Sequence, residues 1–387
     1  MKYWRGYLVA AIVAAITVGL IQLAERFTAL VDMFYPYLTR TMQNFLAEWS
    51  GAVSVNLWQV LAIAAVLLLV VTIVLMILLR WNFIQWLGWV LAVCSLVWLL
   101  NTGVYGLNTY SGPLADDLRL DMAEFSIDEL EEATIYFRDQ ANELALQMPR
   151  DSESNLLYDD FATLANQAGS GFENLVRDEY YSVFAGTLQP VKELGWADGF
   201  RSMGISSVFV PITGEAAVNP HLPAVALPFT MCREMARRMG VAAEDDANFA
   251  AVLACMANED LQFRYSAYFM AYRYCCEALT LSGIPEGAAA AARIKTEVNT
   301  YLHYDLKTYE KYFSTGLNED AVDLTQSLTD RLAISNHGDD RFGDGREAAM
   351  LANWYIQEYI LPYLDQEDAT GFDPMDEDQV DISDIYQ

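Results

Sequence analysis

Three long apolar runs in the first hundred residues constrain this chain more than any other feature. They cover Tyr7 to Leu23, Val55 to Leu79 and Phe83 to Leu100, and each is nearly free of charged residues. A helix of about 20 apolar residues crosses a hydrocarbon core of about 30 Å. The sequence therefore predicts three transmembrane helices, which form a membrane anchor over residues 1–103.

Basic residues set the expected orientation of this anchor. Lys2 and Arg5 precede the first run, and Arg80 lies in the short turn between the second and third runs. No small-residue cleavage site follows the first run, so we interpret it as a span and not as a signal peptide. The positive-inside rule then puts the N-terminus in the cytoplasm and everything after about Thr102 outside it.

The loop between the first two spans, residues 24–54, alternates apolar and polar residues. One interpretation is a helix that lies in the membrane interface, with Tyr35, Tyr37 and Trp49 at the level of the lipid headgroups. A plain buried hairpin helix is an equally good interpretation.

Charge separates the anchor from the rest of the chain. Residues 104–387 hold 18 Lys and Arg against 49 Asp and Glu, a formal charge of −31. Such a surface repels nucleic acid and anionic lipid headgroups, so we expect no nucleic-acid partner. The tail from Asp365 has nine acids and no base, and we expect residues 364–387 to be disordered.

Most of residues 104–363 has helical patterns. One helix is expected from Ser126 to Leu146, with Ser126 and Glu129 placed as a capping box, and another from Asp159 to Gln167. Residues 257–283 favour a further helix, and residues 286–316 continue helical. Residues 204–219 contain β-branched residues around a Thr-Gly pair and predict a short hairpin. Residues 335–347 form a loop rich in Gly and Asp.

The segment from Ala226 to Phe249 has the frame of a zinc peptidase site without its histidines. Pro228 can start a helix and Gly240 can end it, which predicts a helix over 228–239. Arg233 and Arg237 are four residues apart on it and Glu234 follows the first. This is the spacing of H-E-x-x-H with arginine in place of each histidine.

A second helix is expected to begin near Glu244, where three acids precede an apolar run. From the residues alone, simpler interpretations stay open. In one, the three acids only interact favourably with the dipole at the start of their helix. In the other, the arginines form a solvated basic face in which Arg238 pairs with Glu234.

The segment resembles an uncharacterised family of bacterial membrane proteins, described only as a domain of unknown function. Its pattern is a zincin-like P-F-T-x-x-H-E-x-A-H-x-x-G followed by E-x-E-A-N-F. The residues that match in register are Pro228, Phe229, Thr230, Glu234, Ala236, Gly240, Glu244, Ala247, Asn248 and Phe249. Asp246 stands where the second Glu of E-x-E would be, and both histidines are replaced. Further matches lie at 213–219 and 263–268, and weaker similarity runs from about residue 25 to about 360.

This resemblance implies a helical, zincin-like extracytoplasmic domain over residues 104–363. It places Glu234 at a vestigial general-base position and Arg233, Arg237 and Glu244 at former metal-ligand positions. Residues 208–211 would form an edge strand along the cleft. The residues implied to support the site are Asp246, Asn248, Glu215 and Tyr265.

The resulting expectation is a pseudopeptidase without a metal cofactor that acts by binding. Arginine stays protonated and offers only donors, so it cannot ligate zinc. The expected partners are membrane lipid and an extracytoplasmic peptide or protein. Two alternatives remain: an active metallopeptidase that binds zinc through an unusual ligand set, and a structural membrane protein without a functional cleft.

The cysteines and histidines give no replacement ligand set. His221, His303 and His337 are scattered and have no short ligand spacing. Cys232 directly precedes the motif, but buried free cysteine is the commoner state in helices. A disulfide between Cys232 and Cys255 would be permitted outside the cytoplasm, and the sequence leaves it open.

Charge balance predicts what fills the position of the metal. A dication with two neutral histidines and one glutamate has a formal sum of +1, and two arginines with Glu244 have the same sum. Guanidinium groups match carboxylates in geometry, and leaving them buried and unpaired would cost several kcal/mol. We therefore expect Arg233, Arg237 or both to form salt bridges with Glu234, Glu244 or Asp246.

Overall fold

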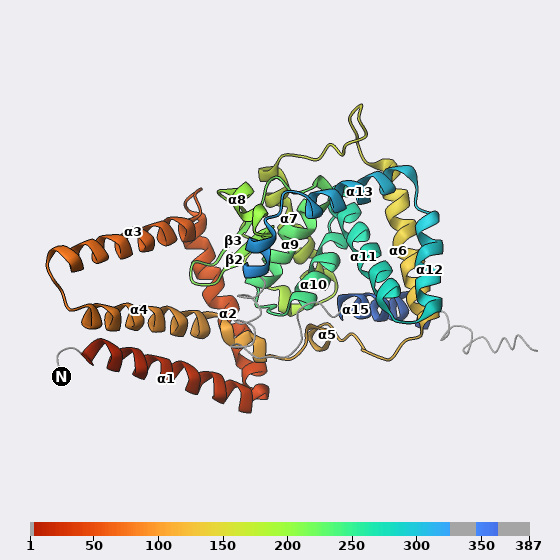
Figure 1. The fold of residues 1–387 in the computed structure, drawn as a ribbon. Helices are drawn as coiled ribbons and strands as arrows, with labels where there is room; N and C mark the ends of the chain where they lie inside the picture. The colour runs from red at the N-terminus through yellow and green to blue at the C-terminus, as the bar shows by residue number, and fades with distance from the viewer. Residues whose placement is uncertain (1–3, 326–345, 363–387) are drawn as a thin grey trace, which may run out of the picture.

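A computed structural model describes residues 4–325 and 346–362, which are mostly helical with one small three-stranded sheet. Figure 1 shows an arm of long helices on one side and a helical body on the other. The arm is formed by the first part of the chain, and the sheet lies in the body near the base of the arm.

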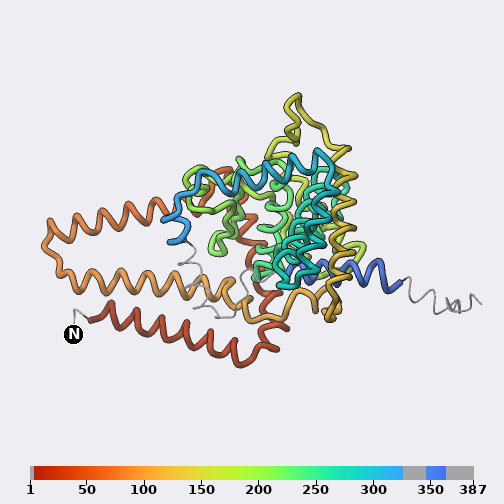
Figure 2. The backbone as a smooth tube through the Cα atoms, turned by 45° about the vertical axis from the view of Figure 1, so that its right-hand side comes forward, coloured from red at the N-terminus to blue at the C-terminus, as the bar shows by residue number. Residues whose placement is uncertain are grey.

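The arm contains the three predicted spans: α1 (Arg5–Arg26), α3 (Leu57–Leu78) and α4 (Phe83–Val104). All three are long and apolar enough to cross a membrane, which confirms them as candidate spans. Helices α1 and α4 pack closely at Gly6 and Gly88. The absence of a side chain on Gly6 permits this contact, since a Cβ atom there would lie 2.5 Å from the backbone of Gly88. Helix α3 stands apart from them in both views (Figures 1 and 2), and no residue of α3 is buried.

Helix α2 (Thr28–Gly51) connects α1 to α3 and runs across the base of the arm (Figure 1). Its residues are thus placed between the spans and the body. Phe27 links the start of α2 to α1, and residues 52–56 link the end of α2 to α3.

The body is built from long helices around one apolar core. Its longer helices are α6 (Ile127–Gln147), α7 (Phe161–Asp178), α9 (Leu227–Arg238), α10 (Glu244–Met256), α11 (Leu261–Leu281), α12 (Pro285–Thr296), α13 (Thr300–Ser314) and α15 (Arg346–Tyr355). Its short elements are η2 (Gly106–Tyr110), α5 (Leu114–Asp117), η3 (Ser182–Phe184), α8 (Ala197–Ser202), η4 (Ala224–Ala226) and η5 (Ile356–Ile360). Large aromatic side chains fill the core, among them Phe137, Phe172, Phe249 and Phe269. Helices α9, α10 and α11 contribute most of their length to it, so the motif segment lies at the centre of the body.

The sheet has the order β1-β3-β2. Strands β2 (Ser207–Val210) and β3 (Glu215–Val218) are antiparallel, with Val208 opposite Ala217, which confirms the predicted hairpin. Gly214 in its turn has a φ of 66°, a conformation that glycine adopts without strain. The strand β1 (Lys192–Glu193) pairs in parallel with β3 and was not predicted.

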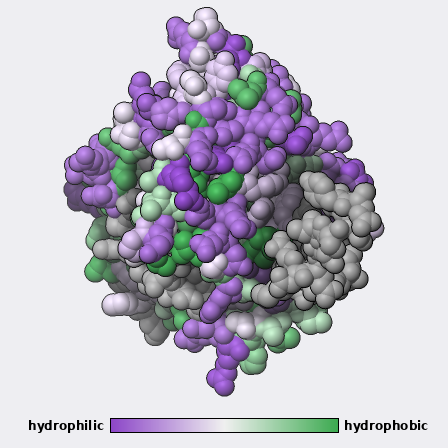
Figure 3. Space-filling view, turned by 90° about the vertical axis from the view of Figure 1, so that its right-hand side faces the viewer, coloured by the Kyte–Doolittle hydropathy of each residue, from purple (hydrophilic) through white to green (hydrophobic). Residues whose placement is uncertain are grey.

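The predicted helices of the body are present, but some of their ends differ from the expected ones. The capping box is confirmed, since the Ser126 hydroxyl accepts from the Glu129 amide and the Glu129 carboxylate accepts from Ser126. Helix α7 extends eleven residues beyond its expected end at Gln167, to Asp178. Most of the Gly- and Asp-rich loop and the whole acidic tail lie outside the described residues. The end of the body that faces away from the arm is mostly hydrophilic (Figure 3).

Candidate functional site

Helices α9 and α10 and the turn between them form the frame of the candidate site. Pro228 lies in the first turn of α9, where its missing N–H removes no helix hydrogen bond. After the helix, Gly240 has a φ of 106°, a left-handed conformation that is typical of a helix C-terminus. Helix α10 begins at Glu244, as predicted. The short turn brings Glu244 back beside α9.

Glu244 bridges the two arginines of the motif. Its Oε2 atom forms an ion pair with Arg237, and its Oε1 atom lies 3.5 Å from Nη1 of Arg233. Arg233 also pairs with Glu234, at 3.2 Å between Nε and Oε1. The ion pairs expected for the two arginines are therefore present, and the plain basic-face interpretation is wrong for Arg233 and Arg237.

Ser207 connects this cluster to the sheet and was not predicted as a site residue. Its hydroxyl donates to Oε1 of Glu234 at 2.7 Å and accepts from Nη2 of Arg233 at 2.6 Å. Because Ser207 is the first residue of β2, the hairpin is held directly to α9. The only signal in the sequence was a pair of serines at the start of the expected hairpin.

The cluster is shielded from solvent but not closed. The side chains of Arg233, Arg237 and Glu244 are 17%, 25% and 31% exposed. Burial by itself would raise the pKa of Glu244, but the charges of Arg237 and Arg233 outweigh it and lower that pKa below its usual value. Burial by itself would lower the pKa of Arg237, but Glu234 and Glu244 outweigh it and raise that pKa. Glu244 and Arg237 therefore both stay ionised at neutral pH.

Glu234 is the most deeply buried member of the cluster. Its side chain is 1% exposed, and its Oε1 atom accepts hydrogen bonds from both Ser207 and Arg233. The other oxygen, Oε2, is buried and has no hydrogen-bond partner in the described part of the chain. A general base has to reach the proton that it abstracts, and this carboxylate is instead held within the protein.

Tyr105, at the end of α4, brings the arm to the edge of the site. Its hydroxyl donates to the carbonyl of Val241 at 3.3 Å, and its ring packs against Phe209 with centroids 5.0 Å apart. Burial raises its pKa, and the charge of Arg237 opposes that shift. A residue adjoining a candidate span is thus electrostatically coupled to the arginine cluster.

Asp246 and Asn248 lie on α10 but do not join the ion cluster. Oδ2 of Asp246 accepts from the amide of Leu114 at 3.1 Å, and Oδ1 lies 4.0 Å from Arg346. These two contacts of Asp246 are made with segments other than α9. Asn248 is buried, and its side-chain oxygen has no hydrogen-bond partner among residues 4–325 and 346–362.

Glu215 was expected near the site, but the structure places its contacts elsewhere. Its carboxylate accepts from the amides of Leu57 at 2.8 Å and Trp58 at 2.7 Å, the first two residues of span α3. Lys192 pairs with it at 2.6 Å. Free N–H groups at a helix start attract a carboxylate, so Glu215 serves as a cap for α3 supplied from the sheet.

Tyr265 was also expected to face the site, and this expectation is wrong. Its hydroxyl donates to Asp305 on α13, whose carboxylate also pairs with Arg150 at 2.7 Å. Tyr265 is fully buried within this separate cluster, which joins α11, α13 and the segment after α6.

The remaining expectations around α9 concern Arg238 and Cys232. Arg238 does not pair with Glu234, because its guanidinium donates to the backbone carbonyls of Thr187 and Gln189. Burial lowers the pKa of Arg238 to about 10. Cys232 and Cys255 are buried free thiols that lie close enough to interact. Both are inside the core, away from solvent.

The donor set of this site is made of guanidinium groups and two carboxylates. In residues 4–325 and 346–362, no three His, Cys, Asp or Glu side chains are grouped so that they could hold a metal. Arg233 and Arg237 offer only N–H donors and cannot ligate a metal. Nε of Arg237 is buried without a hydrogen-bond partner in the same residues.

Comparisons with known proteins give one match. Residues 32–332 match the family model described as "Protein of unknown function (DUF3810)". No curated protein matches the chain. No solved structure matches it either. The matched range starts within α2, includes α3 and α4, and covers α9 and α10 with all members of the ion cluster.

Proposed function

The chain belongs to the DUF3810 family, and on that premise we propose that it is a membrane-anchored binding or regulatory protein with a zincin-like domain that works without a metal. The observation that carries this proposal is the bridge of Glu244 between Arg233 and Arg237. These three residues match the positions of the metal ligands in the zincin-like motif. Two guanidinium groups there repel a dication and pair with the one remaining acidic ligand.

Hydrolysis in a zincin needs a metal to polarise the carbonyl and acidify a water molecule, with the motif glutamate as base. The position of Glu234 argues against this chemistry, because its side chain is 1% exposed and it is held by Ser207 and Arg233. A carboxylate alone contributes too little of the required barrier reduction. Binding is the function that this arrangement favours.

The ligand class that fits best is an extended peptide segment with a carboxylate group. Strand β2 pairs only with β3, so its other edge has no strand partner among the described residues. An open edge binds an extended peptide through main-chain hydrogen bonds. Ser207 on that strand contacts the arginine cluster, and the Arg237 side chain is a quarter exposed. A carboxylate of the peptide would pair with the positive charge of Arg237 at its exposed part.

This proposal can be tested with full-length protein in nanodiscs and a degenerate mixture of short peptides. We expect enrichment of peptides that contain a carboxylate, and we expect Arg237→Gln to abolish it. Arg177→Gln is the matched control, because Arg177 lies in an exposed pair with Asp178 on α7. No enrichment over empty nanodiscs would contradict binding and favour a structural role. Cleavage of peptides that is lost in Glu234→Gln would instead support an active enzyme.

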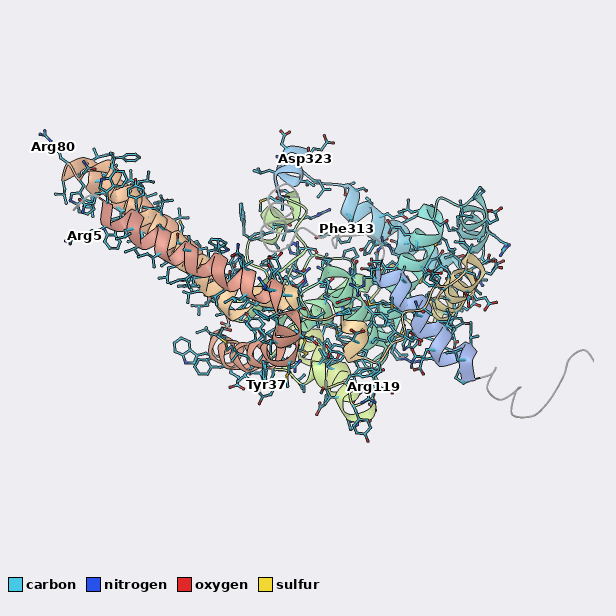
Figure 4. The ribbon with its side chains drawn as sticks, turned by 90° about the horizontal axis from the view of Figure 1, so that it is seen from below. Arg5, Tyr37, Arg80, Arg119, Phe313 and Asp323 are labelled. Atoms are coloured by element: carbon cyan, nitrogen blue, oxygen red, sulfur yellow. The ribbon has the colours of Figure 1, made fainter. Side chains whose placement is uncertain are left out.

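We further propose that the body lies outside the cytoplasm. Arg5 and Arg80 lie at the same end of the arm, far from the body (Figure 4), where positive charge favours the cytoplasmic side. Protease added to intact cells should then remove the chain beyond about residue 104, while the spans stay protected. Cleavage of the body only after cell lysis would show that the orientation is reversed.

A further inference from the structure

Helix α2 has its polar and apolar faces reversed relative to an ordinary helix on a globular domain. The buried face of the helix contains five residues spaced three or four positions apart, and most of them are polar: Tyr35, Thr39, Gln43, Ala47 and Ser50. The opposite side exposes large apolar side chains at half to three quarters of their surface: Leu30, Met33, Phe34, Tyr37, Leu38, Phe45 and Trp49. A soluble helix normally buries the apolar stripe. This exposed stripe needs a partner.

The polar face is fixed to the rest of the protein, so α2 cannot rotate to bury the stripe. Gln43 donates to the carbonyl of Pro211 at 3.0 Å, and Arg40 donates to the carbonyl of Val183 at 3.2 Å. Thr39 accepts from Asn108 at 3.2 Å, and the hydroxyl of Tyr35 donates to the carbonyl of Thr102 at 2.9 Å. These contacts hold one side of α2 against the body and the end of α4.

The position of α2 in the chain restricts where the exposed stripe can lie. The helix starts two residues after span α1 ends, and span α3 begins six residues after α2 ends at Gly51. Since α2 joins two successive spans, both of its ends lie at the same face of the membrane. Its 24 residues extend about 36 Å between these points. Figure 1 shows α2 running across the base of the spans, between them and the body.

From this geometry we infer that α2 lies in the membrane–water interface, with its stripe in the boundary between headgroups and acyl chains. The partner is the lipid bilayer itself. Trp49 and Tyr37 are the most exposed residues of the stripe, at 73% and 72%, and such side chains favour the interface. The residues of α2 that are charged at neutral pH are Asp32, Arg40 and Glu48, a formal charge of −1. Burial of apolar surface drives this contact, so it does not depend on anionic lipid.

Spin labels on the full-length protein in zwitterionic phosphatidylcholine liposomes test the inference. Cys94→Ser removes the exposed native cysteine, and the other four are buried. Labels at Phe45→Cys and Leu38→Cys should be more accessible to oxygen, which concentrates in the bilayer, than to a water-soluble nickel chelate. Ala289→Cys on α12, on the side of the body away from the arm, is the control and should show the reverse order.

Two outcomes would overturn the inference. Labels on α2 that reach the nickel chelate as readily as the control would place the stripe in water. Labels shielded from both reagents would show that protein covers the stripe, from a second copy or another partner. Addition of anionic lipid should leave the accessibility ratio unchanged, and a stripe that enters the bilayer only with anionic lipid would contradict an apolar contact.

Discussion

Two glutamates on neighbouring elements of the body show how differently one residue type can be used. The Glu215 side chain on β3 is completely buried. Its carboxylate pairs with Lys192 and accepts hydrogen bonds from two backbone amides of α3. Glu244 on α10 is 31% exposed and lies between two arginines that are themselves partly exposed. Glu215 has no capacity left for a ligand. The Glu244 cluster is partly exposed, so water can reach it.

The largest effect is expected from removing the enclosed glutamate. Glu215→Ala leaves Lys192 partly buried without its charge partner and removes the acceptor for two amides of α3. Breaking one side of a buried pair costs roughly 3 to 5 kcal/mol. Denaturant unfolding in detergent should show this loss. Glu193→Ala, on the exposed side of β1, is the control and should change stability by under about 0.5 kcal/mol.

A smaller loss is expected from Glu244→Ala. It leaves two guanidinium groups close together without the carboxylate that bridges them, but both can gain water. We expect roughly 1 to 3 kcal/mol, between the values for exposed and buried pairs. The same unfolding assay measures it. A loss as large as that of Glu215→Ala would mean that the cluster is closed and structural.

The pH dependence of stability tests whether the charge of Glu244 contributes to folding. The pKa of Glu244 is lowered in the folded protein, so its charge contributes stability above the usual glutamate pKa of about 4.3. This contribution disappears as the pH falls through the folded-state pKa. The stability difference between wild type and Glu244→Gln should be constant above about pH 5.5 and shrink below about pH 4.3. A difference that persists unchanged at acid pH would show that charge is not its source.

The smallest effect is expected at Tyr105. Tyr105→Phe removes one long hydrogen bond to Val241 and keeps the ring contact with Phe209. A neutral hydrogen bond contributes about 1 kcal/mol, so the loss of stability should be at most this size. Peptide binding at the arginine cluster should persist. A variant that folds normally but loses binding would make Tyr105 part of the ligand site.

Local patterns in the sequence predicted most of the helix starts and ends around the site. The capping box at Ser126, the left-handed Gly240 and the start of α10 at Glu244 follow from residues within one helix turn of each other. The ion pairs of Glu244 were also predictable, because α9 and α10 are joined by a turn too short to separate them. The three spans follow from composition alone.

Contacts between distant segments were not predictable from one sequence. Glu215 meets Leu57 across 158 positions of the chain, and Tyr265 meets Asp305 across 40. No local spacing marks such pairs, so both glutamate and tyrosine were assigned to the nearest motif. Ser207 was missed for the same reason, since only the docking of β2 on α9 brings it to Glu234. The two-residue strand β1 is too short to leave a pattern.

We propose that arginines have replaced the histidines of a zinc site while the rest of the site persists. The most direct test is the metal content of the purified full-length protein after dialysis, measured for wild type and for the double variant Arg233→His with Arg237→His. We predict no bound zinc in wild type and near-stoichiometric zinc in the double variant, with Glu244 as the third ligand. Stoichiometric zinc in wild type, or a folded double variant that binds none, would contradict the claim.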